Sequence, residues 1–436
     1  MIHRLLMTGL LAGLLFLWPQ ALTAQTAEPL GTTAPPLSFS FDAFLAEVAQ
    51  NNLEYAAQRY NVSIAQAQIA KAKVFPNPTL GSGYSRDVSH TSGQELPDSL
   101  NVGITQTFLT GGKRRAGIEV AEKNYLAAGA TLEDFFRNLR AASANAFIDA
   151  LAAQLIVEQK RRSSEALDRL VEANEKRFRA GDLAEIDVTQ SRVEALQFHS
   201  ELLAAEANHL TAVIALSQFL GQWRSFATVA PAGRLDVPAK TFVLSELVED
   251  ALKRRADVAA AWQSREAARA SVQLAKANRI PDVDIGITGQ RTGQSTNTIS
   301  PSPQAYYIGL SLSIPLPIFN TLRAELNMAR FTSEQTEKNW QAARLKAEVE
   351  IRQAYARYQL ATERIAKYKE GVLRDAASVL EAKLYSYRRG QTSLLEVLNA
   401  QREENNVHLA YYDTLTEYAK TLVALEQAAG IWDVHF

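Results

Sequence analysis

The stretch Ala70-Lys71-Ala72-Lys73-Val74-Phe75-Pro76-Asn77-Pro78 ends an alanine-rich helical pattern in proline, and it returns as Ala275-Lys276-Ala277-Asn278-Arg279-Ile280-Pro281-Asp282-Val283. Similar helical segments precede the two stretches. Similar segments also follow them: an alternating strand, a long helix that opens on Arg-Ala, and a glycine inside a helical pattern. Two matching units of roughly two hundred residues predict one duplicated body rather than several unrelated domains.

The predicted boundaries follow from this repeat. We place repeat 1 at 41–220, a proline- and glycine-containing connector at 221–241, and repeat 2 at 242–436. Each repeat is expected to contain a helix, a β-hairpin, a long helix, a turn at a glycine and a final helix. The hairpins are predicted at 79–109 and 282–314, and the turns at Gly181 and Gly390. The predicted fold class is therefore α+β.

The hairpins carry a period of two. In the second hairpin the apolar residues Ile308, Leu310 and Leu312 alternate with the small residues Gly309 and Ser311. An apolar face opposite a small polar face is typical of a transmembrane barrel, with lipid outside and water inside. A half-buried sheet on a soluble helical protein is the alternative interpretation of the same pattern.

The number of strands limits how such a barrel can close. One chain supplies four strands, whereas transmembrane barrels have at least about eight. Open strand edges are not tolerated in lipid, so the barrel must be shared between chains. Three copies would supply twelve strands.

After each hairpin the helical pattern is unusually long. The segments 113–178 and 321–387 contain no proline. A helix of that length extends about 100 Å, at 1.5 Å per residue. No single globular domain needs such a length, which predicts elongated pillars packed as coiled coils.

The N-terminal residues indicate export. His3 and Arg4 precede an apolar run from Leu5 to Trp18, and small residues lead to Ala24, which predicts a cleaved signal peptide at 1–24. Residues 25–40 are rich in Thr, Ala and Pro and are expected to form an extended linker. The 436 residues include no cysteine, so disulfides, thiolate metal sites and a lipid-modified N-terminal cysteine are excluded. The formal net charge is −1 and no basic run stands out, so nucleic acid is not an expected partner.

No constellation typical of catalysis or metal binding is present. A nucleophile, a base and an orienting group do not cluster, so we expect no enzyme, no catalytic residue and no cofactor. Six histidines show no close i, i+4 pairing with carboxylates, so we expect no metal site. These histidines are His3, His90, His199, His209, His408 and His435. The Gly111-Gly112-Lys113 segment is similar to a phosphate loop only superficially, because the upstream glycine of that motif is missing.

One segment carries a family resemblance: Tyr387-Arg388-Arg389-Gly390-Gln391-Thr392-Ser393-Leu394-Leu395-Glu396-Val397-Leu398-Asn399-Ala400-Gln401. Together with the order of elements given twice, it resembles the TolC-like outer-membrane efflux family. The segment Gly111-Gly112-Lys113-Arg114-Arg115-Ala116 is similar to the cation-efflux, CzcC-type branch of that family.

The resemblance implies a homotrimer in the outer membrane of a Gram-negative envelope. Its twelve-stranded barrel would contact outer-membrane lipid, and a twelve-helix tunnel would continue through the periplasm. The tips of the tunnel would dock onto a periplasmic adaptor and an inner-membrane pump. The expected function is a passive exit duct for heavy-metal cations. A multidrug or type I secretion channel is the alternative, and a soluble periplasmic coiled-coil adaptor is an alternative of a different class.

The resemblance also implies site residues. Tyr387, Asp187 and Glu396 match family positions that close the periplasmic mouth, and the turns at Gly181 and Gly390 match the docking tips. The chain departs from the multidrug members at Thr392, where they have a gating arginine, and at Asn399, where they have a second acidic residue. The bland alternatives are plain turns at the glycines and solvated charges at the carboxylates.

Overall fold

The computed structural model describes residues 38–88, 96–223, 230–295 and 297–436. The predicted signal peptide at 1–24 and most of the predicted linker at 25–40 lie outside these residues, as do His3 and His90.

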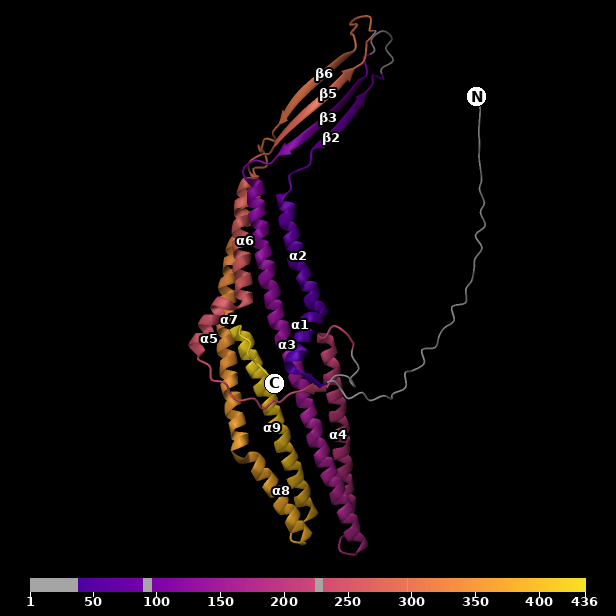
Figure 1. Cartoon of the computed structure of the whole chain (residues 1–436), viewed down its shortest axis with the longest axis vertical. Coiled ribbons are helices and arrows are strands. Elements are labelled where there is room, and N and C mark those ends of the chain that lie inside the picture. Colours follow the sequence, from indigo (N-terminus) through magenta and orange to yellow (C-terminus); the bar gives the residue numbers. More distant parts are fainter. Residues whose placement is uncertain (1–37, 89–95, 224–229, 296) are drawn as a thin grey trace, which may run out of the picture.

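The same order of elements occurs twice along the chain (Figure 1). The first half contains α1 (Phe41–Asn51), α2 (Leu53–Lys73), β2 (Thr79–Ser85), β3 (Ser99–Phe108), α3 (Lys113–Arg179) and α4 (Glu185–Phe219). The second half contains α5 (Leu244–Arg254), α6 (Ala256–Asn278), β5 (Val283–Thr292), β6 (Ala305–Ser313), α7 (Arg323–Lys367), α8 (Leu373–Arg388) and α9 (Leu394–Ala429). Two short strands, β1 (Ser38–Ser40) and β4 (Ala230–Ala232), pair in parallel.

The two hairpins form one sheet. The strand order is β2-β3-β5-β6 and every pairing in it is antiparallel. The register between β3 and β5 runs from Ser99 opposite Thr292 to Phe108 opposite Val283. The outer edges of β2 and β6 pair with no other strand in the described part of the chain. The sheet is therefore open at both sides.

The two long helices differ. α3 runs without a break for 67 residues, which corresponds to about 100 Å. The expectation of one continuous helix over 321–387 is wrong, because a π-helical turn at Tyr368–Val372 separates α7 from α8. Gly371 is a poor helix former, and Lys369 beside it pairs with Asp236 of the connector at 2.5 Å. The backbone of Gly371 leaves the helical region, with φ 164° and ψ −18°, and this residue marks the break.

The short upper helices stack end to end on long lower ones. Asn52, which precedes α2, donates a hydrogen bond from its side chain to the carbonyl of Phe219 at the end of α4 (3.1 Å). Arg255, which precedes α6, donates to the carbonyl of Ala428 at the end of α9 (2.9 Å). Gly221 closes the first joint with φ +69°, and a Cβ there would lie 2.0 Å from the carbonyl oxygen of Asn51. In this way α2 extends the line of α4 toward the sheet, and α6 extends the line of α9.

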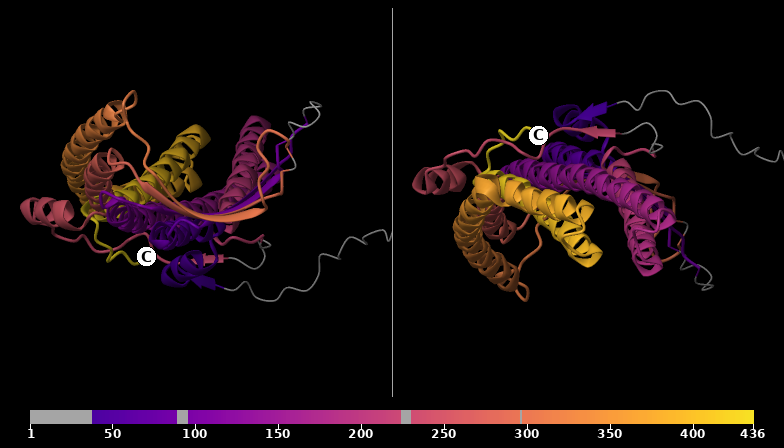
Figure 2. Two further views of the ribbon diagram at one scale, coloured as in Figure 1. Left: turned by 90° about the horizontal axis from the view of Figure 1, so that it is seen from above. Right: turned by 90° about the horizontal axis from the view of Figure 1, so that it is seen from below.

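The helices form a curved layer, seen end on in Figure 2, with α1, α5 and the C-terminus on its convex side. The main hydrophobic core lies beneath these attachments, where Phe41 and Phe44 of α1 pack on Phe147 of α3. Within the described residues, no helix combines the length and the hydrophobicity needed to cross a membrane.

Candidate functional site

The sheet has one apolar face. Its register places Leu80, Ile104, Ile287 and Leu310 opposite one another across all four strands. Their side chains are 73%, 54%, 59% and 81% exposed. Neighbouring rows add Val102 with Ile308 and Ile285 with Leu312. A continuous exposed apolar surface of this kind is a site for lipid or for another protein.

The opposite face is small and polar. One row contains Gly81, Gly103, Thr288 and Gly309, and the next contains Thr105, Gly286 and Ser311. In a third row Asn101 lies opposite Gln290, and Gln290 lies opposite the exposed aromatic residue Tyr307. The alternation predicted within each hairpin therefore extends across the whole sheet. The small polar face is suited to contact with water.

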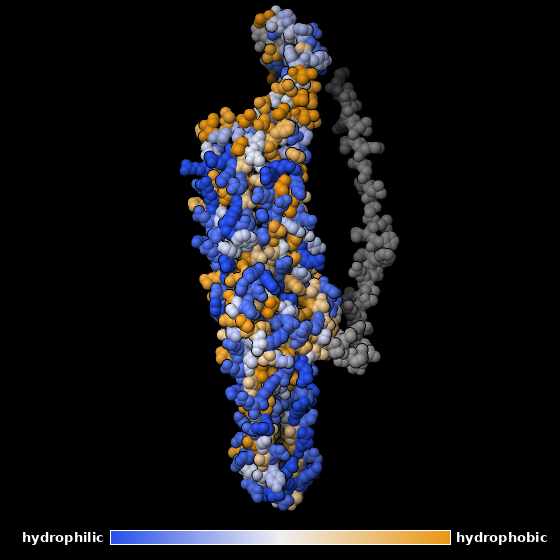
Figure 3. Space-filling view, turned by 60° about the vertical axis from the view of Figure 1, so that its left-hand side comes forward, coloured by the Kyte–Doolittle hydropathy of each residue, from blue (hydrophilic) through white to orange (hydrophobic). Residues whose placement is uncertain are grey.

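Apolar residues also surround the foot of the sheet. The loop between β6 and α7 contains Leu316, Ile318 and Phe319, all largely or fully exposed. Figure 3 shows hydrophobic residues over the lower sheet and the upper ends of the helices, whereas the lower helices are mostly hydrophilic. The apolar surface is thus confined to one end of the molecule.

The opposite end carries the two glycine turns. Gly181 and Gly390 have φ of +84° and +73°, and a Cβ at either position would meet nothing within 4 Å. After α3, the amide of Asp182 donates to the carbonyl of Arg177 at 2.9 Å. After α8, the amide of Gln391 donates in the same way to Ser386. Both helices therefore end in Schellman-type caps, and the glycines are required for their conformation rather than for space.

Tyr387 joins the two turn regions. Its side chain is 6% exposed, and its hydroxyl donates to Oδ1 of Asn174 on α3 at 2.9 Å. The guanidinium of Arg177 lies 5.2 Å from the ring centroid. Burial raises the pKa of Tyr387; the charge of Arg177 opposes this rise and that of Asp187 adds to it. The tyrosine thus anchors the second repeat against the first.

The structure does not group the three predicted gate residues around one hydrogen-bonded centre. Asp187 is in the first turn of α4, half-buried and near Tyr387. Glu396 is exposed in the first turn of α9, where Lys383 (2.5 Å) and Thr392 (2.7 Å) contact its Oε2. The hydrogen bond from Lys383 is the largest factor that lowers the pKa of Glu396. Asn399 is exposed one turn further along α9.

The contact with Lys383 corrects one expectation. Because Thr392 stands where the multidrug members have a gating arginine, the resemblance predicts that Glu396 lacks that family counter-charge, with Arg388 and Arg389 as the possible substitutes. Lys383 on α8 supplies the counter-charge to Glu396 instead. The pair is formed across the turn, thirteen residues apart, so no helical spacing in the sequence signals it.

Other cross-helix contacts near the turns were also not predicted. Glu194 of α4 is buried and forms a two-pronged salt bridge with Arg402 of α9, in which Nε lies 2.6 Å from Oε1. Ser163 of α3 donates to Asn405 of α9 at 3.2 Å. These polar pairs fix how the α3–α4 hairpin sits against α9, and their residues are ordinary helix-surface types in the sequence.

In the described residues no group of three His, Asp or Glu side chains is arranged to hold a metal ion. The expectation that no histidine pairs at i, i+4 is wrong for His408, whose Nε2 lies 3.1 Å from Glu404 on the same helix. One histidine and one carboxylate do not make a metal cage.

Comparisons with known proteins agree with this geometry. A family model described as "Outer membrane efflux protein" matches residues 45–222 and 247–431. The chain is 25% identical to the cobalt-zinc-cadmium resistance protein CzcC of Cupriavidus metallidurans, with 95% of this chain and 97% of that protein covered. It is 23% identical to the outer membrane protein TolC of Vibrio cholerae, with 87% of each covered. It is also 29% identical to the nickel-cobalt-cadmium resistance protein NccC of Alcaligenes xylosoxydans xylosoxydans, with 68% and 64% covered.

Solved structures show the same fold. The crystal structure of CusC aligns with a TM-score of 0.75 at 18% identity, covering 93% of this chain and 96% of that one. The outer membrane protein VceC of Vibrio cholerae aligns with a TM-score of 0.70 at 22% identity, covering 89% and 96%.

Proposed function

Because this chain belongs to the outer membrane efflux protein family, we propose that it forms the outer-membrane exit duct of a tripartite efflux system. The duct is a homotrimer, and it conducts substrate passively. In this proposal the signal peptide at 1–24 directs export, and each repeat, 41–220 and 242–436, contributes one hairpin and its long helices.

The observation that carries the proposal is the two-faced sheet with two open edges. Lipid covers the apolar face, and the Gly/Ser/Thr face lines a water-filled interior. Unpaired edges in lipid leave backbone groups without hydrogen bonds, so β2 of one chain pairs with β6 of the next. Three chains close a twelve-stranded barrel. The concave sides of the three helical layers then enclose a periplasmic tunnel.

The glycine turns form the far end of the tunnel. In our proposal they dock onto a periplasmic adaptor that connects the duct to an inner-membrane pump. Asp187, Tyr387 and Glu396 lie within this end and control the width and charge of the mouth. What supports this role is the anchoring of Tyr387 against α3, because such a contact holds the two helical hairpins together.

Heavy-metal cations are the proposed substrate. The support is the similarity to CzcC and NccC, both of which are named for resistance to metal ions. The similarity to TolC keeps a broader multidrug or protein-exporting role as the second candidate. A soluble adaptor, the alternative of a different class, has no support from the family model that matches.

Two experiments test the proposal. The mature protein, extracted from the membrane fraction, should require detergent and run at about three times the mass of one chain. A detergent-independent monomer contradicts the duct. Deletion of the gene in its host should lower tolerance to zinc, cobalt or cadmium while leaving drug tolerance unchanged. The reverse result assigns the duct to a drug pump.

A further inference from the structure

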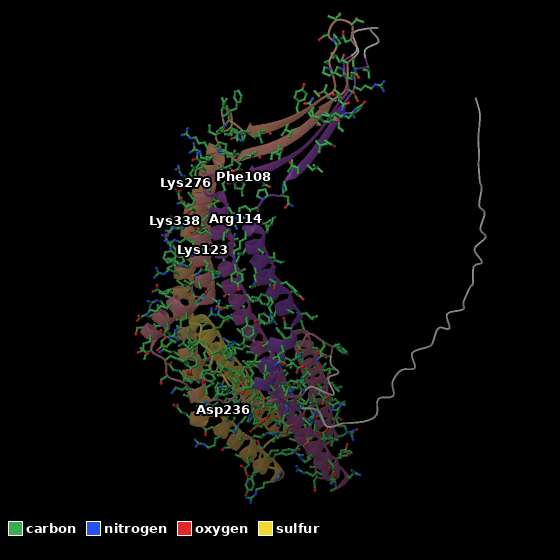
Figure 4. The ribbon with its side chains drawn as sticks, turned by 45° about the horizontal axis from the view of Figure 1, so that its top comes forward. Phe108, Arg114, Lys123, Asp236, Lys276 and Lys338 are labelled. Carbon is green, nitrogen blue, oxygen red and sulfur yellow. The ribbon has the colours of Figure 1, made fainter. Side chains whose placement is uncertain are left out.

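A hollow of about 390 Å³ lies at the foot of the sheet, between the start of α3 and the end of α6. Its lining includes Gly111, Arg115, Glu119, Lys276 and Ile280. Figure 4 shows Phe108 at the end of the sheet, with Lys276 to its left at a similar level and Arg114 below it, both at the upper ends of the helices. The hollow is therefore at the level where the apolar surface ends and the charged helices begin.

Two cations line this hollow without forming an ion pair among the described residues. The first turn of α3 contains Lys113, Arg114 and Arg115 and no acidic residue. Cations are disfavoured at a helix N-terminus, so α3 itself does not explain them. Lys113 pairs with Asp282 at 2.7 Å, and Arg114 donates to the carbonyl of Lys73 at 2.8 Å. Arg115 remains, and neither it nor Lys276 has a carboxylate within 4.0 Å in the part of the chain that the structure describes.

Arg115 lies on the side of the apolar face. Asp284 and Gly286 of β5 belong to the polar face of the sheet. Asp282 directly precedes β5 and is two residues before Asp284, so it lies on the same side. Lys113 pairs with Asp282 and so points to the polar side. Residues two apart on an α-helix are about 200° apart around its axis, which directs Arg115 to the opposite side.

We propose that this hollow binds the headgroup phosphate of an anionic glycerophospholipid from the adjoining membrane leaflet. Arg115 and Lys276 contact the phosphate, and an acyl chain lies over Ile280 and Phe108, which are 48% and 51% exposed. Glu119 on the rim reduces the charge of the two cations to a net single positive charge, which matches one phosphodiester. The inference rests on the proposed function, because it requires the apolar face to be in lipid.

The test is native mass spectrometry of the mature detergent-solubilised protein, titrated with equal amounts of phosphatidylglycerol and phosphatidylcholine. A basic residue close to an anionic lipid surface contributes about a fivefold preference. The double variant Arg115→Gln with Lys276→Gln should therefore lower the ratio of bound phosphatidylglycerol to bound phosphatidylcholine by roughly 25-fold. Inclusion of 1 M salt should weaken the wild-type preference, since the Debye length falls to about 3 Å.

The matched control removes two exposed cations from lower on the same helix, by Arg162→Gln with Arg169→Gln, and should leave the ratio unchanged. An equal loss in the control, or an unchanged ratio in the hollow variant, overturns the inference. Displacement of phosphatidylglycerol by millimolar inorganic phosphate also overturns it, because the hollow is then a plain anion site. Insertion into vesicles is measured in parallel: a protein that inserts without lipid preference contradicts only this inference, whereas one that never inserts contradicts the proposed duct.

Discussion

Tyr387 shows how one side chain can hold two repeats together. Its hydroxyl gives Asn174 a hydrogen bond in a buried setting, and Nδ2 of the same asparagine has no partner among the described residues. Tyr387→Phe leaves the buried oxygen of Asn174 without a donor, which should cost about 1–3 kcal/mol of stability. Denaturant unfolding of the purified protein measures the change. Tyr385→Phe, at an exposed position on the same helix, is the control and should have no effect.

In the proposed duct, Lys383 contributes to the charge of the periplasmic mouth together with Asp187 and Glu396. Removing the lysine by Lys383→Gln frees Glu396, and the resulting rings of carboxylates should increase cation selectivity and block by divalent ions. Glu396→Gln and Asp187→Asn should reduce both. Single-channel recording in planar bilayers provides the measurement. If all three variants have the same selectivity as the wild-type protein, the three side chains are solvated surface charges.

A substitution at Gly390 tests whether its turn serves the proposed docking or only the folding of the chain. The φ of +73° at this glycine disfavours any side chain, so Gly390→Val should cost on the order of 1–2 kcal/mol at the turn. We expect adaptor pull-down to fall more than trimer recovery. Gly129→Ala, at an open position inside α3, should instead stabilise the helix by about 1 kcal/mol and preserve docking. If Gly390→Val reduces docking and assembly equally, the glycine serves folding alone.

At the scale of elements, the joint between α9 and α6 depends on a buried charge. Arg255 is 1% exposed and is held by Asp257 and Glu350, each at 2.7 Å. Arg255→Met removes the buried partner of both carboxylates, which keep only the longer contacts of Asp257 with Arg137 (3.9 Å) and of Glu350 with Lys346 (3.7 Å). Because Asp257 and Glu350 are also partly exposed, the substitution should lower stability by up to about 3 kcal/mol. Asn52→Ala at the other joint removes a neutral cap and should cost only about 0.5–2 kcal/mol. Comparable losses at both joints would contradict a special role for the charge.

The same joint should give a pH dependence. Burial opposes ionisation of Asp257, but the hydrogen bond and charge of Arg255 outweigh it, so the pKa of Asp257 is lowered. A lowered folded-state pKa adds stability above the unfolded-state value of about 3.9, and this stability is lost as the pH falls below that value. In Asp257→Asn this part of the acid destabilisation should be absent from unfolding curves recorded between about pH 5 and pH 2.

How far the elements could be predicted depends on whether their cause is local. The length of α3 follows from a sequence without proline, and the alternation of β6 follows from its own residues. The break between α7 and α8 lies at Gly371, but Gly117 and Gly129 inside the unbroken α3 show that a glycine in a helical pattern does not by itself predict a break. The partner of Glu396 and the anchoring of Tyr387 are contacts between elements. Their residue types are unremarkable until the helices are placed side by side.

At the scale of the whole molecule, the open edges of β2 and β6 have a genetic consequence. If three chains share one barrel, a chain that pairs normally but blocks the tunnel damages every assembly that it enters. With equal amounts of blocked and normal chains, only about one assembly in eight contains three normal copies. A blocked variant that still assembles should therefore be dominant over the wild-type copy in the same cell, measured as metal tolerance at matched expression. Simple dilution to half of the wild-type activity would indicate that each chain works alone.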